Sequence, residues 1–222
     1  DMSLYFKGAF FAATTAGSYY CLLVLDVSPW VRLLFATMYG LSALFLSLNV
    51  AHDAAHGTFT GKKNIDHCIQ QAAMGILGVD GYLWRMRHNG SHHVFPNING
   101  CDIDIDENPF IRLSPNHSRR AYQRYQHVYA PLIYMIVTFH SIFIQDVAYL
   151  FKRELSNMRN IRHAGRDIAI FLLGKFAYVA ITFVIPKLMT GLPWWEILVG
   201  YAIASAIVSN VFVLMLAGTH FS

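Results

Sequence analysis

The sequence contains few charged residues and few cysteines for its length. Only 14% of its 222 residues are Asp, Glu, Lys or Arg, and no run of arginines with interleaved aromatics occurs. Binding to nucleic acid therefore has little support. The three cysteines, Cys21, Cys68 and Cys101, form no Cys-x-x-Cys pair. Such an odd, scattered set excludes a disulfide framework and a zinc knuckle, and we interpret the cysteines as reduced thiols.

Apolar residues are abundant instead. They make up 55% of the chain, and the mean hydropathy of +0.38 is too high for an ordinary soluble domain. Several segments approach the ~20 residues that a helix needs to cross a bilayer. The short connections between these segments predict two helical hairpins, and hence an all-α integral membrane protein. Its four transmembrane helices are expected at residues 8–25, 30–50, 168–186 and 194–217.

The basic residues predict which side of the membrane each connection faces. Residues 52–129 contain eight of the 17 Lys and Arg residues, and residues 151–166 contain five more. The positive-inside rule places both stretches in the cytoplasm. Residues 130–150 are apolar enough to span, but a crossing there would put the second stretch outside. We therefore predict that this segment lies in the membrane interface, with Gln145 and Asp146 toward water.

The region between the hairpins is expected to form a helical cap. Residues 69–84 are modestly apolar and are interrupted by Gly78-Val79-Asp80-Gly81, so we interpret them as interfacial or re-entrant. The chain contains no internal repeat. The sequence thus predicts a single domain over residues 1–222, with a cytoplasmic cap over residues 52–166.

Two clusters of histidines lie where apolar segments meet polar ones. Box one is His52 with His56, and box two is His88 with His92 and His93. A helix places residues i and i+4 on one face, with Cβ atoms roughly 6 Å apart. Imidazole suits zinc, copper, iron and nickel. A structural zinc site usually includes cysteine, and no cysteine lies beside these boxes, so the pattern favours two metals that share a set of histidines.

Other polar residues have plainer interpretations. Histidines 67, 117, 127 and 163 are expected on the solvated surface, whereas His140 is expected to hydrogen-bond within the fold. The acidic residues 102, 104, 106 and 107 mimic an EF-hand, but the sixth position is Glu107 and the twelfth is Leu113, which excludes calcium. We expect a solvated acidic loop there. Lys175, inside the third predicted span, either snorkels or pairs with a group in the bundle.

The two boxes closely resemble those of the membrane fatty acid desaturases. The carriers of the resemblance are His-Asp-Ala-Ala-His-Gly at 52–57 and Trp-Arg-Met-Arg-His-Asn-Gly-Ser-His-His at 84–93. Their HxxxH and HxxxHH spacing is that of the acyl-lipid and front-end, linoleoyl-CoA desaturase-like branch. The similarity extends to Pro96–Gly100 and to Gly165-Arg166-Asp167. It implies a membrane enzyme with two iron ions that uses O2 to insert a double bond into a fatty acyl chain.

The resemblance also implies roles for individual residues and partners. It makes His52, His56, His88, His92 and His93 metal ligands, with His220 as a further ligand after the last span. The substrate would be an acyl-CoA or an acyl-lipid, and the electron donor cytochrome b5 or a ferredoxin. This branch has a third box, Gln-x-x-His-His, further along. The sequence given ends before such a box, so we expect a truncated desaturase that is inactive alone.

Neighbours of the boxes have two interpretations each. Asp53 and Asn89 could hydrogen-bond a ligand imidazole and fix its tautomer, or they could face water at a helix end. Arg85 and Arg87 could hold an anionic head group of the substrate, or they could snorkel at the interface. The box residues themselves leave two rival functions. One is another membrane di-iron oxidase, such as a hydroxylase or ketolase, although those tend to space box two as HxxHH. The other is a non-catalytic metal-binding membrane protein.

Overall fold

The computed structural model describes the backbone of residues 2–220 and the side chains of residues 2–216. Within these residues every regular element is a helix, as the sequence predicts. The order is α1 (Met2–Val24), α2 (Pro29–Leu46), η1 (Ser47–Ala51), α3 (His52–Ala55), α4 (Lys63–Leu77), α5 (Gly81–Arg87), η2 (His88–His92), η3 (Ile103–Ile105), η4 (Ala121–Tyr125), α6 (Gln126–Tyr134), α7 (Val137–His140), η5 (Ser141–Gln145), α8 (Asp146–Phe151), α9 (Gly165–Val179), η6 (Ala180–Val184), α10 (Ile185–Thr190) and α11 (Trp194–His220).

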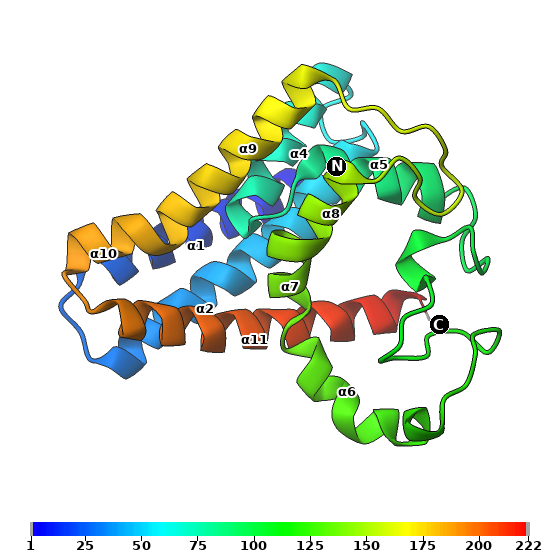
Figure 1. The fold of residues 1–222 in the computed structure, drawn as a ribbon. Helices are drawn as coiled ribbons and strands as arrows, with labels where there is room; N and C mark the ends of the chain where they lie inside the picture. Colours follow the sequence, from blue (N-terminus) through cyan, green and yellow to red (C-terminus); the bar gives the residue numbers. More distant parts are fainter. Residues whose placement is uncertain (1, 221–222) are drawn as a thin grey trace.

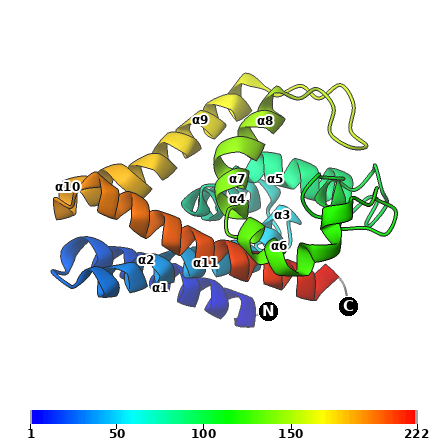
Figure 2. The same cartoon turned by 60° about the horizontal axis from the view of Figure 1, so that its bottom comes forward.

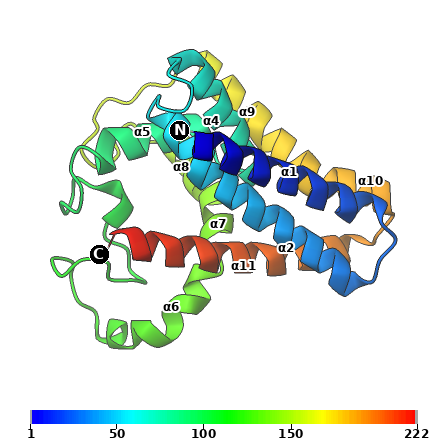
Figure 3. The ribbon, with the colours of Figure 1, turned by 180° about the vertical axis from the view of Figure 1, so that it is seen from behind.

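The first hairpin is formed by α1 and α2, which lie side by side (Figure 3). Pro29 begins α2 because its fixed φ suits the first helical turn, and Ser28 caps that turn by accepting a hydrogen bond from the N–H of Val31. Helix α2 then continues through η1 and α3 as one apolar rod to Ala55. The predicted second span therefore delivers His52 at its end, as expected.

The second hairpin consists of α9, η6 and α10 as one long helix, followed by α11. Gly191, at φ 68°, ends α10 in the left-handed conformation that glycine adopts without strain. Helix α11 crosses closely against α2: a Cβ on Gly40 would lie 2.7 Å from Cγ2 of Val208. Both hairpin turns lie at one end of the molecule, and the segments that carry the boxes lie at the other (Figure 1).

Three helices are long and apolar enough to cross a membrane: Pro29–Ala55, Gly165–Thr190 and Trp194–Leu216. They coincide with the second, third and fourth predicted spans. Helix α1, which contains the first predicted span, is not among them. A broken pair, residues 121–134 and 137–151, qualifies only if both halves are counted together across a bend of 67°. That pair descends beside α11 in Figure 2.

The predicted orientation of residues 130–150 is wrong at Asp146. This carboxylate is fully buried, whereas the sequence placed it toward water. Nζ of Lys175, on α9, lies 2.8 Å from Oδ2 of Asp146 and also donates to the carbonyls of Gly78 and Ile142. The ion pair with Lys175, from a distant segment, determines which way the Asp146 side chain points. Hydropathy does not reveal such a pair. Of the two alternatives for Lys175, the structure shows the second, in which it pairs with a group inside the bundle.

Helices α4 and α5 lie beneath the end of α2 and form the base of the site. Leu46, Val50 and Ala51 pack against Ala73 and Met74 in one buried cluster. Gly78, at φ 90°, ends α4, and the ring of Tyr178 lies so close that a Cβ there would be 2.8 Å from it. The left-handed conformation and the close approach of Tyr178 thus both require glycine at the end of α4.

Breaking the buried ion pair is expected to destabilise the fold. Asp146→Ala leaves the Lys175 ammonium buried without its carboxylate, which typically costs about 3–5 kcal/mol. The melting temperature of the purified protein in detergent measures the loss. Glu154→Ala is the matched control, because the Glu154–Arg159 pair is 62% and 61% exposed and such pairs contribute about 0–1 kcal/mol. Equal melting temperatures for the two variants would contradict the assignment.

Candidate metal centre

Box one begins where α2 widens. The turn η1 is π-helical, so the N–H of His52 bonds to the carbonyl of Ser47 five residues earlier. Such single wide turns are frequent at functional sites. His52 and His56 follow on the short helix α3 and its end, with ring centroids 4.8 Å apart. The expectation that these two rings share a face is therefore met by the structure.

Box two is also built on a π-helical turn, and this changes which histidines meet. Asp80 caps α5 by accepting the N–H of Leu83 at 2.8 Å. In η2 the N–H of His93 bonds to the carbonyl of His88 at 2.9 Å, a five-residue step. The ring of His93 consequently lies 4.4 Å from that of His88, whereas the ring of His92 lies 5.6 Å away. An α-helical period had paired His88 with His92.

Imidazole nitrogens of both boxes converge. One nitrogen from each of His52, His56, His88 and His93 lies within 4.8 Å of all the others. Nε2 of His88 is 3.2 Å from Nε2 of His52 and 2.9 Å from Nε2 of His93. Two nitrogens on one metal at about 2.1 Å are roughly 3.0–3.4 Å apart for bond angles of about 90–110°. The distance between His88 and His52 lies in this range and the distance between His88 and His93 just below it, so these nitrogens are close enough to bind a common metal ion.

His88 is the centre of this four-histidine cluster and is held in place by Trp84. The indole stacks on the imidazole with centroids 4.2 Å apart and planes 24° apart. Burial above all, followed by the rings of His93, His52, His56 and His92, lowers the pKa of His88 to about 2. Burial and the neighbouring His52 and His93 also lower the pKa of His56. Neutral imidazole is the form that binds metals, so the cluster is poised as a set of ligands.

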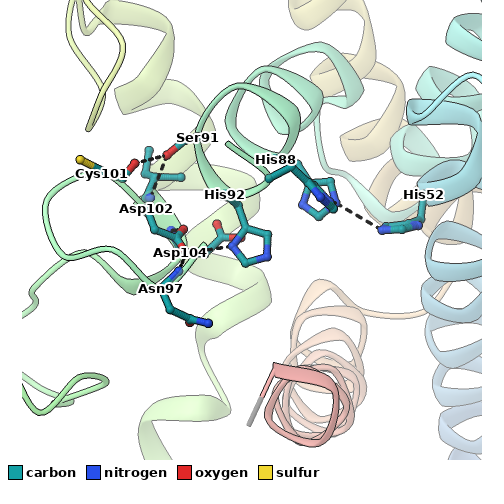
Figure 4. A network of polar contacts seen from close by, with 10 residues as sticks. His52, His88, Ser91, His92, Asn97, Cys101, Asp102 and Asp104 are labelled. Atoms are coloured by element: carbon teal, nitrogen blue, oxygen red, sulfur yellow. Dashed lines mark hydrogen bonds and ion pairs between the residues drawn. The ribbon is translucent and has the colours of Figure 1, made fainter. Parts of the chain in front are cut away.

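His92 lies beside the cluster and belongs to a second group. Its Nδ1 is 2.9 Å from Oδ2 of Asp102 and 3.9 Å from Oδ2 of Asp104. Figure 4 shows both aspartates beside the ring of His92. Asp102 is fully buried, so the prediction of a solvated acidic loop is wrong at this residue. The sequence gives no periodic signal for the contact, because a loop of irregular backbone brings Asp102 back to box two.

His220 is the remaining predicted ligand. It is the last residue of α11, and its side chain lies outside the described residues. The end of α11 is on the same side of the molecule as the boxes (Figure 1). His220 therefore stays a prediction.

Of the two residues predicted to hydrogen-bond a ligand imidazole, Asp53 lies beside one and Asn89 bonds elsewhere. Oδ1 of Asp53 is 3.3 Å from Nδ1 of His52, as one interpretation had it. Asn89 instead donates to the carbonyl of Ala55 at 3.0 Å, which ties box two to the backbone of box one.

Among the histidines expected at the surface, His117 is 4% exposed, so that expectation is wrong. Tertiary packing of the loop buries it.

The two arginines beside box two each contact a side chain of the protein. Arg85 donates to the side chain of Gln70. Arg87 is 8% exposed, and its guanidinium lies 5.0 Å from the centre of the Tyr149 ring. Neither guanidinium group is fully exposed, and a role in holding the head group of a substrate stays a prediction for both.

An apolar cavity of about 400 Å³ lies between the spans. It is lined by side chains of α2, α9, α10 and α11, including Tyr39, Ala43, Tyr178 and Val208. None of the five described imidazoles of the boxes lines it. Its position between apolar helices suits a hydrocarbon, but it is separate from the metal-binding residues.

An all-helical fold with long apolar helices, and with imidazoles gathered at one end, defines a membrane protein with a candidate metal centre. Residues 28–221 match the family model described as fatty acid desaturase, and the chain belongs to that family. This confirms the resemblance of the boxes.

Curated relatives agree. The chain is 29% identical over 187 residues to an acyl-lipid (8-3)-desaturase of Physcomitrium patens. The aligned region covers 83% of this chain and 38% of that protein. It is 29% identical over 189 residues to an sn-1 linoleoyl-lipid 6-desaturase of Arthrospira platensis, covering 85% and 48%. A Synechocystis protein of the same name is 27% identical, covering 86% and 54%. The chain thus spans about half the length, or less, of these relatives. No solved structure matches significantly.

Removing the central imidazole is expected to weaken metal binding at the four-histidine cluster. His88→Ala takes away the ring that contacts both His52 and His93, so metal affinity should fall at least ~10-fold. Metal titration of the purified full-length protein measures it. His127→Ala, at an exposed position outside both groups, is the control and should bind metal normally. Undiminished binding by His88→Ala would contradict the cluster as a ligand set.

Proposed function

We propose that this chain forms the membrane and metal-binding part of an oxygen-dependent di-iron fatty acid desaturase. The observation that carries the proposal is the convergence of four imidazoles from two boxes, with nitrogens within 4.8 Å, at the end of an apolar helix. Membership of the family supports the same chemistry. The proposed ligands are His52, His56, His88, His92 and His93, with His220 as a sixth.

Two iron ions bound by these residues would supply the oxidising power to remove two hydrogens from an unactivated chain. The reaction consumes one O2 and two donor electrons with two protons, and it yields one cis double bond and two waters. The residues of the chain orient the ligands and keep them neutral: Trp84 fixes the His88 ring, and burial keeps His88 unprotonated.

The setting of the site supports the proposed class of substrate, and the resemblance to the family supports the proposed electron donor. A site at the end of membrane helices meets chains that the bilayer supplies, and the names of two relatives specify acyl-lipid and linoleoyl-lipid. We therefore propose a fatty acyl chain on a lipid or on CoA. Cytochrome b5 or a ferredoxin is the proposed donor. Because the relatives are about twice as long, we also propose that the 222 residues do not turn over alone.

The proposed topology has four spans in two hairpins, with residues 52–166 as a cytoplasmic cap of a single domain. Helix α1 packs along α2 and would complete the first hairpin. The bend of 67° between α6 and α7 supports the proposed placement of residues 130–150 in the membrane interface. The boxes and the end of α11 then share the cytoplasmic side.

Product analysis separates a desaturase from its rivals. The full-length protein, expressed in a host with its electron donor, is expected to contain two irons per chain and to form an alkene. His56→Ala is expected to lose iron and to lower product by at least ~100-fold, since the loss of a ligand disables the di-iron site. A hydroxylated product would favour the rival oxidase. One zinc per chain without product would favour a non-catalytic metal-binding protein.

Cysteine labelling tests the topology. With the three native cysteines replaced by serine, Arg159→Cys is expected to react only with reagent that reaches the cytoplasm, because residues 152–164 belong to the proposed cap. Arg159 is 61% exposed, so access does not limit the reaction. Asp26→Cys, in the exposed first hairpin turn, is the control and should react only from the opposite side. Labelling of both from one side would contradict the proposed number of spans.

A further inference from the structure

The loop after box two is fastened to it by Ser91. This serine is fully buried in η2. Its hydroxyl donates to the carbonyl of Cys101 at 2.7 Å and accepts the N–H of Ile103 at 3.0 Å. These two bonds grip the backbone on either side of Asp102. The position of Asp102 relative to box two is therefore fixed by the box itself.

The carboxylate of Asp102 is fully engaged at that position. Oδ2 lies 2.9 Å from Nδ1 of His92 and accepts the N–H of Asn97, also at 2.9 Å. Oδ1 accepts the N–H of Asp104 at 2.9 Å. A carboxylate only accepts hydrogen bonds, so the hydrogen in the contact with His92 lies on Nδ1. His92 is thereby held as the tautomer whose lone pair is on Nε2.

We infer that Asp102 is a positioning residue for the metal ligand His92. It holds the hydrogen on Nδ1, fixes the plane of the ring and makes Nε2 the nitrogen that donates to iron. Figure 4 shows the ring with Nδ1 toward Asp102 and the other nitrogen facing away from the loop. The inference rests on the proposed function, since it assigns a partner to one of the proposed ligands.

A different arrangement, with a separate metal held by His92, Asp102 and Asp104, fits the contacts less well. Both oxygens of Asp102 already accept backbone N–H groups, and Asp104 is 42% exposed. Carboxylates that accept N–H bonds and lie against a ligand imidazole are the usual outer partners of metal-bound histidine. Asp102 therefore acts through His92.

The test compares Asp102→Asn with Asp104→Asn in the full-length protein. Each variant is stripped of metal and titrated with Fe(II) without oxygen, and Co(II) absorption is recorded as a second readout. Asp102→Asn is expected to weaken one of the two bound ions ~10–100-fold and to change the Co(II) spectrum. Asp104→Asn is expected to bind both ions as the wild type does. Asp102→Glu, which keeps the carboxylate, should recover part of the affinity.

The same substitutions in a His92→Ala background separate positioning from a general effect on folding. If Asp102 acts through His92, Asp102→Asn adds no further loss of metal once the imidazole is gone. A further loss there, or unchanged affinity in Asp102→Asn alone, overturns the inference. An equal loss in Asp104→Asn overturns it as well and points to carboxylate ligands. Wild-type protein that binds no iron overturns the proposed function itself.

Discussion

The ammonium of Lys175 connects the third apolar helix to the segments that support box two. Oδ2 of Asp146 accepts from Lys175 and also from the backbone N–H of Asp80, which caps α5. Helix α5 leads directly into box two. A buried ion pair contributes little net stability, but each of its members requires the other. The position of box two thus depends on a contact made within the apolar bundle.

Much of the architecture could be predicted from the sequence. The hydropathy of α2, α9–α10 and α11 marks them because each is a long apolar helix of which only a minor share is buried inside the protein. The two boxes can be recognised because only a few residue types bind metals and because their spacing in the sequence is fixed. Asp146, Asp102 and His117 were assigned to water, since a single sequence does not reveal which distant segment covers a polar side chain.

The metal centre shows the same division between local and tertiary information. A four-residue spacing predicts that His52 and His56 meet, and they do. The same argument fails for His88 because η2 has a wider turn, so that His93 takes the place expected for His92. His92 is then oriented by Asp102, ten residues later, through a loop whose path depends on Ser91. Turn width and loop path are set by packing, not by helical periodicity.

The π-helical turns η1 and η2 have a consequence for the way the histidines are aimed. Each such turn equals an α-helix with one extra residue, and one residue corresponds to about 100° of rotation. If the same residues of η1 were wound as a regular α-helix, the apolar rod would stay nearly intact, but both imidazoles of box one would rotate by about 100° around its axis, away from box two. The number of residues in these helical turns, more than the choice of any side chain, thus determines where the ligands point.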